Sequence, residues 1–217
     1  MENLATDNGI SAIQNGIKFP RMNLSNPHKE QDLVWIALIF YLLMSVVGLA
    51  LILWRHQSFG WPPLAAPDES WPLALGTTIA LILGIHLLSR LACAKSPQLR
   101  KCGREIVQML GKLGPVQILA IAIASGIGEE LLFRGWLMHE TGLWISSLIF
   151  GIVHVPPTRE WVFWPFFATA MGLLLGWLYH WSGSLVFPIF LHAGINFLNI
   201  KMLVEQSTQA NHEADTS

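Results

Sequence analysis

Two glutamates and an arginine lie within a long apolar stretch of this chain, in the segment Ser125-Gly-Ile-Gly-Glu129-Glu130-Leu-Leu-Phe-Arg134-Gly135. A charged side chain near the centre of a bilayer costs at least ~2.5–3.5 kcal/mol, so an intramembrane charged cluster indicates a functional site with paired members. On a helix, Glu130 and Arg134 are four residues apart and share a face, where they can form an ion pair. Glu129 lies about 100° around the helix from Glu130 and is left to face another partner.

The composition supports placing this stretch in a membrane. The chain has 217 residues, of which 53% are hydrophobic and only 12% are charged, which is too apolar for an ordinary soluble domain. The net charge of -1 indicates neither a nucleic acid nor an acidic partner. Cys93 and Cys102 match no C-x-x-C metal or redox pattern. We therefore expect an all-α, polytopic transmembrane helix bundle embedded in the lipid bilayer, with no nucleic-acid partner.

The apolar runs predict about six membrane crossings, because each long run can cross ~30 Å of hydrocarbon at ~1.5 Å per residue. The chain divides into four parts: a disordered cytoplasmic tail (1–32), two N-terminal spans with a basic cytoplasmic loop (33–113), a core of four spans (114–203) and a second disordered tail (204–217). The first tail is polar and lacks the apolar core of a signal peptide. The core spans are expected at 114–138, 143–155, 161–181 and 184–203, with a turn at 139–142.

The segment 90–112 is the most basic part of the chain. It contains one acid, Glu105, and these basic residues: Arg90, Lys95, Arg100, Lys101, Arg104 and Lys112. The positive-inside rule places this loop in the cytoplasm, and the first loop, with only Arg55, on the other side. We expect both termini in the cytoplasm and the protein in a bacterial-type plasma membrane. An amphipathic surface helix over 98–113 and a solvated loop both fit this segment.

The fifth span contains Gly172-Leu-Leu-Leu-Gly176, a G-x-x-x-G pattern that lets another helix approach closely. As a dimerisation signal this pattern is weak. We therefore favour packing within the protein, and the oligomeric state stays open.

Further polar residues lie inside the late spans. His154 follows Phe150 by four residues, and Asn196 follows His192 by four, so each pair shares a helix face. A lone intramembrane histidine is more often a hydrogen-bond partner between helices than a catalyst. That structural role is assigned to two other histidines: His86 and His180.

The depths of three polar side chains in the membrane agree. At ~1.5 Å per residue, Glu129 and His192 lie about 12 Å from the extracytoplasmic turns, and His154 lies about 18 Å from them. Ordinary helix tilts can bring all three to one level. We therefore expect these side chains to converge on one cavity.

This set of side chains suits the hydrolysis of a substrate by water. A carboxylate flanked by two imidazoles in a low-dielectric cavity can deprotonate a water, either directly or through a bound metal. Asn196 can donate a hydrogen bond to a developing oxyanion, and Arg134 can fix Glu130 in place. Because no positioned Ser or Cys motif is present, water-mediated hydrolysis is favoured over covalent catalysis.

Three motifs occur in this order on successive late spans: Glu129-Glu130-x-x-x-Arg134, Phe150-x-x-x-His154 and His192-x-x-x-Asn196. They resemble the motifs of the CPBP intramembrane proteases, a group that contains the CAAX prenyl endoproteases and bacteriocin-processing enzymes and is also called the Abi family. The resemblance covers residues 114–203. It implies an endopeptidase that cleaves a membrane-embedded or membrane-associated peptide or protein, of the CAAX type or the bacteriocin-leader type.

The resemblance also implies the following roles: Glu129 acts on water together with His154, Glu130 and Arg134 order the site, and His192 and Asn196 bind the water or stabilise the oxyanion. The family has been described both as metal-dependent and as glutamate-dependent without metal. Glu129, His154 and His192 are therefore either zinc ligands or a metal-free catalytic group. The motif-bearing bundle is shorter than that of the eukaryotic CAAX enzymes, which leaves the use of prenylated substrates open.

The alternative is a non-catalytic membrane protein of the same fold, such as a scaffold or immunity protein. A binding role does not need two Glu, two His and an Asn together, so the complete set of motifs favours a protease. A transporter is less favoured because no paired repeats with broken helices occur.

The charge asymmetry predicts the topology. A cytoplasmic reporter fused after Lys101, or after either terminus, should be active, because the flanking Lys and Arg residues are retained inside the cell. Reporter fusions that are active only in the cytoplasm or only outside it measure this directly. An extracytoplasmic signal from the Lys101 fusion would contradict the topology.

Overall fold

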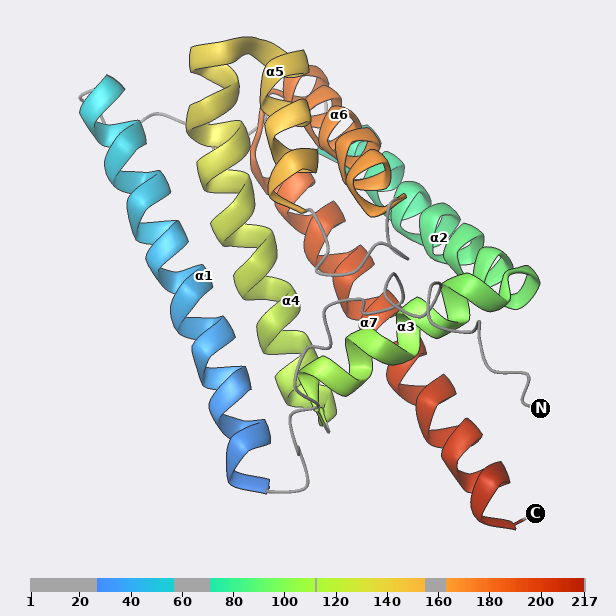
Figure 1. Cartoon of the computed structure of the whole chain (residues 1–217). Helices are drawn as coiled ribbons and strands as arrows, with labels where there is room; N and C mark the ends of the chain where they lie inside the picture. Colours follow the sequence, from blue (N-terminus) through green and yellow to red (C-terminus); the bar gives the residue numbers. More distant parts are fainter. Residues whose placement is uncertain (1–26, 57–70, 112, 155–162, 217) are drawn as a thin grey trace, which may run out of the picture.

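The computed structural model describes residues 27–56, 71–111, 113–154 and 163–216 and is helical throughout most of these ranges. The elements, in chain order, are α1 (Pro27–His56), α2 (Trp71–Lys95), α3 (Pro97–Leu110), α4 (Pro115–Glu130), the π-helix η2 (Leu131–Leu137), α5 (Met138–Val153), α6 (Trp164–Ser182) and α7 (Val186–Thr216). In Figure 1, α1 lies beside α4, α7 runs on the other side of α4, and the shorter α3 crosses in front of α7. The predicted all-α transmembrane bundle is confirmed.

Several helical runs are long and apolar enough to cross a membrane. Those among the described residues are Asp32–Arg55, Trp71–Lys95, Pro115–Val153 and Val186–Gln209. The third run has two helical parts, because the chain reverses at Gly142, where φ is 81° and ψ is 169°. Glycine adopts this positive φ without the steric cost that other residues have. With α6, whose 19 residues extend ~28 Å, the described helices are compatible with the expected bundle of about six spans.

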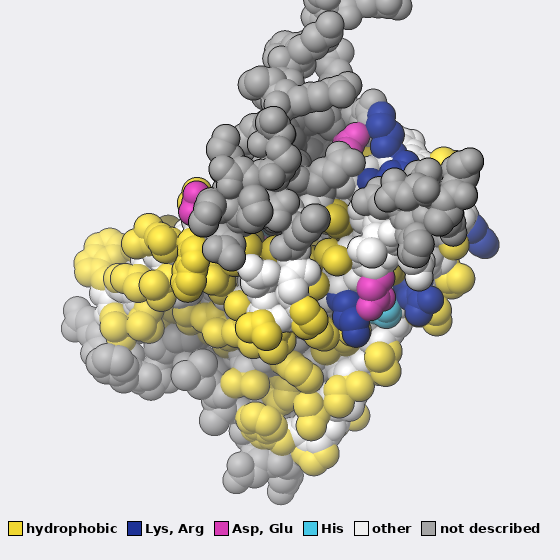
Figure 2. Space-filling model, turned by 90° about the horizontal axis from the view of Figure 1, so that it is seen from below, with side chains coloured by type: hydrophobic (Ala, Val, Ile, Leu, Met, Phe, Trp, Pro, Cys, Tyr) yellow, Lys and Arg dark blue, Asp and Glu magenta, His cyan; other side chains and the backbone are white. Residues whose placement is uncertain are grey.

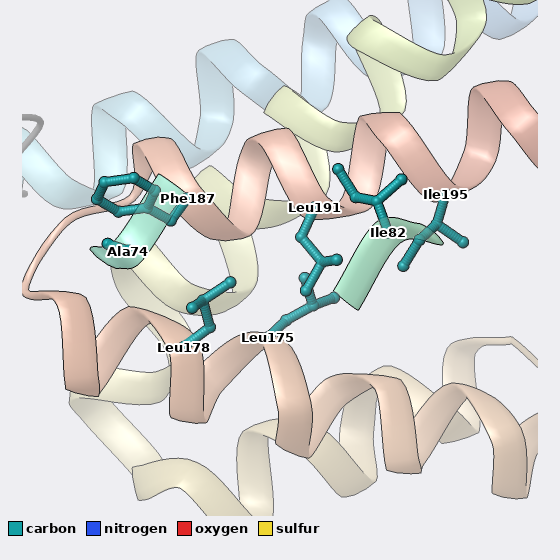
Figure 3. Close-up of a cluster of buried hydrophobic side chains, with 7 residues drawn as sticks. All are labelled: Ala74, Ile82, Leu175, Leu178, Phe187, Leu191 and Ile195. Carbon is teal, nitrogen blue, oxygen red and sulfur yellow. The ribbon is translucent and has the colours of Figure 1, made fainter. Parts of the chain in front are cut away.

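A buried apolar cluster joins α2, α6 and α7 (Figure 3). Its members are Ala74, Ile82, Leu175, Leu178, Phe187, Leu191 and Ile195. By contrast, many large apolar side chains on the outside of the helices are exposed, such as Trp35 and Leu83. A bilayer solvates such side chains, while the backbone polar groups are satisfied within each helix.

Two glycines set the position of α6 against α5. A Cβ atom at Gly172 would lie 3.1 Å from the backbone of Ser147, and a Cβ at Gly176 would meet the side chain of Leu143. Both contacts are with the neighbouring helix of the same chain. The G-x-x-x-G pattern therefore serves packing within the protein, as predicted.

Close backbone contact also fixes α1 against α4 and η2. A Cβ atom at Gly48 would lie 2.9 Å from the backbone nitrogen of Leu132. The side chain of Ile52 is fully buried and lies against Gly135. Although most of α1 faces outward, this seam sets its register and its rotation about its own axis.

The ends of two helices differ from the sequence prediction. Helix α1 begins at Pro27, inside the stretch 1–32 that was expected to be a disordered tail, and residues 1–26 lie outside the described part. Helix α7 runs to Thr216, although a disordered tail was expected over 204–217. Leu203 packs on Gly103 of α3, and Val204 packs on a second apolar cluster, so the helix continues past the predicted end of the span.

The basic segment forms the surface helix α3, which decides between the two structures considered for it. Ser96 caps its first turn by accepting a hydrogen bond from the Leu99 N–H at 3.3 Å. The Arg100 guanidinium donates to the carbonyls of Cys93 and Ala94 at the end of α2. Figure 2, a view of the molecule from below, shows Lys and Arg side chains gathered on one side of this surface.

The seam between α1 and η2 yields a test of the packing. Gly48→Ala should lower the melting temperature in detergent, because the new methyl group meets backbone atoms that cannot move aside, and overpacking costs ~1–3 kcal/mol. Gly84→Ala in α2 is the matched control, since a Cβ there has nothing within 4 Å. Equal melting temperatures for the two variants would contradict the seam.

Candidate functional site

The two adjacent glutamates end α4 at its most buried part. Glu129 and Glu130 are 5% and 0% exposed, respectively. The π-helix η2 follows immediately and contains Arg134, which is 1% exposed. Short π-helical segments occur frequently at functional sites. The three charged residues of this segment therefore lie at the junction of the α-helix with the π-helix, and all three are buried.

Glu130 is the centre of a buried ion-pair network. Its Oε1 accepts a hydrogen bond from Arg134 Nη1 at 2.8 Å and another from His192 Nδ1 at 2.8 Å. Arg134 Nη2 also donates to the Gly172 carbonyl of α6 at 3.2 Å. Charge-assisted hydrogen bonds of this kind offset the cost of removing both charges from water.

The ring of Phe150 completes the surroundings of Arg134. The guanidinium carbon lies 4.4 Å from the ring centroid, a cation–π contact. The same ring lies 4.4 Å from the His154 imidazole, centroid to centroid, and 6.2 Å from that of His192. The Phe150 ring thus packs against the Arg134 guanidinium, the His154 imidazole and the His192 imidazole.

The hydrogen bonds of the two histidines fix which ring nitrogen is available. His154 Nδ1 lies 2.6 Å from the Phe150 carbonyl oxygen. A carbonyl only accepts, so Nδ1 carries the hydrogen and Nε2 is left bare in the neutral ring. His192 is oriented in the same way, because its Nδ1 donates to the carboxylate of Glu130.

Both available nitrogens face the second glutamate. Glu129 Oε2 lies 3.6 Å from His154 Nε2 and 3.9 Å from His192 Nε2. This oxygen is buried and has no hydrogen-bond partner among the described residues. A buried polar atom without a partner indicates that a water, an ion or a substrate group belongs beside it. The structure thus brings together the three side chains that were expected to converge.

Asn196 lies at the same site, one turn from His192 on α7. Its amide nitrogen donates to Ser125 Oγ at 2.9 Å. Ser125 is buried and precedes Glu129 by one turn of α4. The amide group has two N–H donors, so one is left for a substrate oxygen.

The side chains expected to hold a zinc ion are Glu129, His154 and His192. Zinc–nitrogen and zinc–oxygen bonds are ~2.0–2.2 Å long. Within the described ranges, however, no group of three His, Cys, Asp or Glu side chains is arranged to hold a metal ion. Zinc binding by Glu129, His154 and His192 therefore stays a prediction.

The sequence analysis missed one side chain of the site. Tyr41 of α1 makes a side-chain hydrogen bond with Glu129. A signal existed: tyrosine in transmembrane helices is usual at the membrane interface, whereas Tyr41 is in the middle of a span. The membrane-spanning part of α1 is apolar on all sides, so its sequence does not indicate which of its side chains face the bundle.

The other intramembrane histidines do not join the site. His86 Nδ1 lies 2.9 Å from Asn199 Oδ1, a contact that joins α2 to α7. His180 is exposed on α6. His86 therefore has the predicted role of a hydrogen-bond partner between helices. Among the described residues, no such partner is found for His180.

The buried ion pair predicts which substitution damages the fold. Arg134→Ala leaves the Glu130 charge without its cation, and breaking one partner of a buried pair costs ~3–5 kcal/mol. The melting temperature in detergent should fall strongly, while Glu129→Gln should leave it unchanged or raise it.

The double variant Glu130→Gln with Arg134→Ala is the control for that effect. It removes the uncompensated charge and keeps an acceptor for His192, so it should recover part of the loss. If Arg134→Ala melts like the wild type, the ion pair does not stabilise the bundle.

Comparison with known proteins covers the same segment. Residues 112–198 match the family model described as type II CAAX prenyl endopeptidase Rce1-like. The Bacillus subtilis (strain 168) protein named "Uncharacterized protein YpbD" is 37% identical over 75 residues, which is 35% of this chain and 39% of that protein. Another from the same strain, named "Putative membrane peptidase YdiL", is 33% identical over 99 residues, 42% of this chain and 38% of that protein. No solved structure matches the chain.

This chain thus spans about two fifths of the length of the curated relatives it matches. The matched segment begins before α4 and ends within α7, so it contains all three motifs. The resemblance to the CPBP proteases is confirmed by this match. Over residues 112–198, this chain is therefore similar to the Rce1-like type II CAAX prenyl endopeptidases.

Proposed function

We propose that this protein is an intramembrane endopeptidase that hydrolyses a peptide bond of a membrane-associated substrate, with Glu129 as the base that activates water. The observation that carries the proposal is the buried Glu129 Oε2, which has no hydrogen-bond partner among the described residues and faces two imidazole nitrogens. A water beside this oxygen would have one strong acceptor and two further polar partners. Such a water is positioned and activated for attack.

The hydrolytic step follows from these groups. Glu129 takes one proton of the water while the water oxygen forms a bond to the scissile carbonyl carbon, and the carbonyl oxygen becomes an oxyanion. The remaining N–H of Asn196 and the protonated form of an adjacent imidazole can stabilise that oxyanion. When the C–N bond breaks, Glu129 returns the proton to the leaving amine. The products are a carboxylic acid and an amine.

Glu130 supports this chemistry without taking part in proton transfer. Its Oε1 is occupied by Arg134 and His192. The hydrogen bond to His192 Nδ1 holds the imidazole so that Nε2 points towards Glu129. Arg134 holds Glu130 in turn. These two residues are therefore positioning residues in the proposed mechanism.

The matched family supports a proposal for the substrate class. A model built on CAAX prenyl endopeptidases supports a substrate peptide held at the membrane by a lipid on cysteine. The partly exposed His154, at 27% side-chain exposure, lies on the more open side of the site and is the point at which a peptide could reach Glu129. We place the protein in a bacterial-type plasma membrane with both termini in the cytoplasm.

Substitution of the proposed base tests the function. Glu129→Gln should abolish cleavage, a loss of at least ~10²-fold, because the amide cannot accept the proton of water. His154→Ala and His192→Ala should also abolish it. The measurement is a quantitative comparison of peptide termini in membranes that contain the wild-type or the Glu129→Gln protein, which identifies substrates by the new termini that cleavage creates.

Glu140→Gln is the matched control for this experiment. Glu140 is a partly exposed acid outside the site that pairs with Arg55 at 2.9 Å, so its variant should cleave like the wild type. Near wild-type cleavage by Glu129→Gln would make Glu129 structural and favour the non-catalytic scaffold. Loss of cleavage on treatment with a chelator, restored by zinc, would instead assign a metal to the site.

A further inference from the structure

Helix α1 lies outside the segment that matches the family model, yet its backbone contacts α4 at the site. A Cβ atom at Gly128 would lie 2.8 Å from the Tyr41 carbonyl oxygen and 3.3 Å from Ser45 Oγ. The Ser45 hydroxyl donates to that same carbonyl at 2.8 Å. Only a glycine next to Glu129 allows this approach. The contact therefore brings Tyr41 beside the residue that precedes the proposed base.

The seam at Gly48 provides a second, independent point of contact. It lies two turns further along α1, where the backbone meets Leu131 and Leu132. Two close contacts on one face fix both the rotation and the register of a helix that is otherwise apolar on all sides. The Tyr41 side chain therefore has a defined direction.

The surroundings of Tyr41 are apolar except at its hydroxyl. The ring packs against the cluster of Val34, Leu113, Ile118 and Ile121, two members of which belong to α4. It also makes an edge contact with Phe40, with 5.3 Å between ring centroids. The polar end of the side chain bonds to Glu129. A buried phenol needs such a partner, because an unsatisfied hydroxyl in an apolar region is costly.

We infer that Tyr41 is a positioning residue of the site: its hydroxyl donates a hydrogen bond to the Glu129 carboxylate and directs Oε2 towards His154 and His192. An ionised carboxylate can only accept, so the phenol is the donor. Without this bond the Glu129 side chain could rotate away from the imidazoles. The inference rests on the proposed function for its catalytic part and on the α1–α4 contact for its structural part.

The chain offers a matched pair of substitutions, because Tyr41 and Tyr179 are its two tyrosines. Tyr179 bonds to His139 at 3.1 Å, away from the site. Tyr41→Phe and Tyr179→Phe each remove one hydroxyl and keep the ring packing. Tyr41→Phe should lower kcat about tenfold, the effect of one hydrogen bond to a charged group, with KM within about twofold. Tyr179→Phe should leave kcat within about twofold of the wild type.

A second readout requires no substrate. Incorporation of 3-fluorotyrosine gives two fluorine NMR signals, which the two Phe variants assign. Glu129→Gln should shift the Tyr41 signal and leave the Tyr179 signal in place, because only Tyr41 bonds to that carboxylate. Melting in detergent should be equal for the two Phe variants, so that a fall in kcat is not a loss of fold.

The outcomes separate the two proposals. An unmoved Tyr41 signal in Glu129→Gln overturns the inference, and so does a Tyr41→Phe protein with wild-type kcat. Equal losses of kcat in both Phe variants would assign a general structural effect and also overturn it. If the wild-type protein cleaves nothing, the proposed function and the positioning role fail together, while the fluorine signal still decides whether the hydroxyl bonds to Glu129.

Discussion

The buried Arg134–Glu130 ion pair is the interaction on which the rest of the bundle depends. Both side chains are almost fully excluded from solvent, at 2% and 0% exposure. A charge in such surroundings persists only if neighbouring groups replace its hydration. The Arg134 guanidinium therefore reaches the Phe150 ring of α5 and the Gly172 carbonyl of α6, and Glu130 reaches His192 of α7. Satisfying a single pair thus fixes the relative positions of five successive elements, from α4 to α7.

That network explains why two adjacent carboxylates have different tasks. Consecutive helical residues point about 100° apart, so Glu130 faces the bundle interior while Glu129 faces the space between His154 and His192. The donors around Glu130 both bond to its Oε1, and the Oε2 atoms of both glutamates have no hydrogen-bond partner in the described part of the chain. Oε2 of Glu129 differs in facing the Nε2 atoms of His154 and His192. One carboxylate holds the site together because its cation is nearby. In the proposed mechanism the other, Glu129, accepts a proton, because it has no ion pair with an arginine or lysine among the described residues.

Much of the candidate site could be predicted from the sequence, because polar residues inside a membrane are stable only where they contact other polar groups. The spacing of Glu130 and Arg134 predicted their ion pair, and the depths of Glu129, His154 and His192 predicted that they meet. The extension of α7 to Thr216 was not predictable in the same way. The contacts near its start, of Leu203 with Gly103 and of Val204 with a second apolar cluster, join segments far apart in the sequence.

The contribution of α1 shows the limit of reading a membrane protein span by span. Its sequence is apolar on every side, so no hydrophobic face reveals which residues point inward. Rotation is set instead by where another backbone can approach, and that depends on glycines in both partners: Gly48 in α1 and Gly128 in α4. A sequence match restricted to residues 112–198 therefore contains the ionisable groups but not the helix that bears Tyr41. A helix outside the motif-bearing segment can thus adjust the orientation of Glu129 through one hydroxyl, without any change to the motifs themselves.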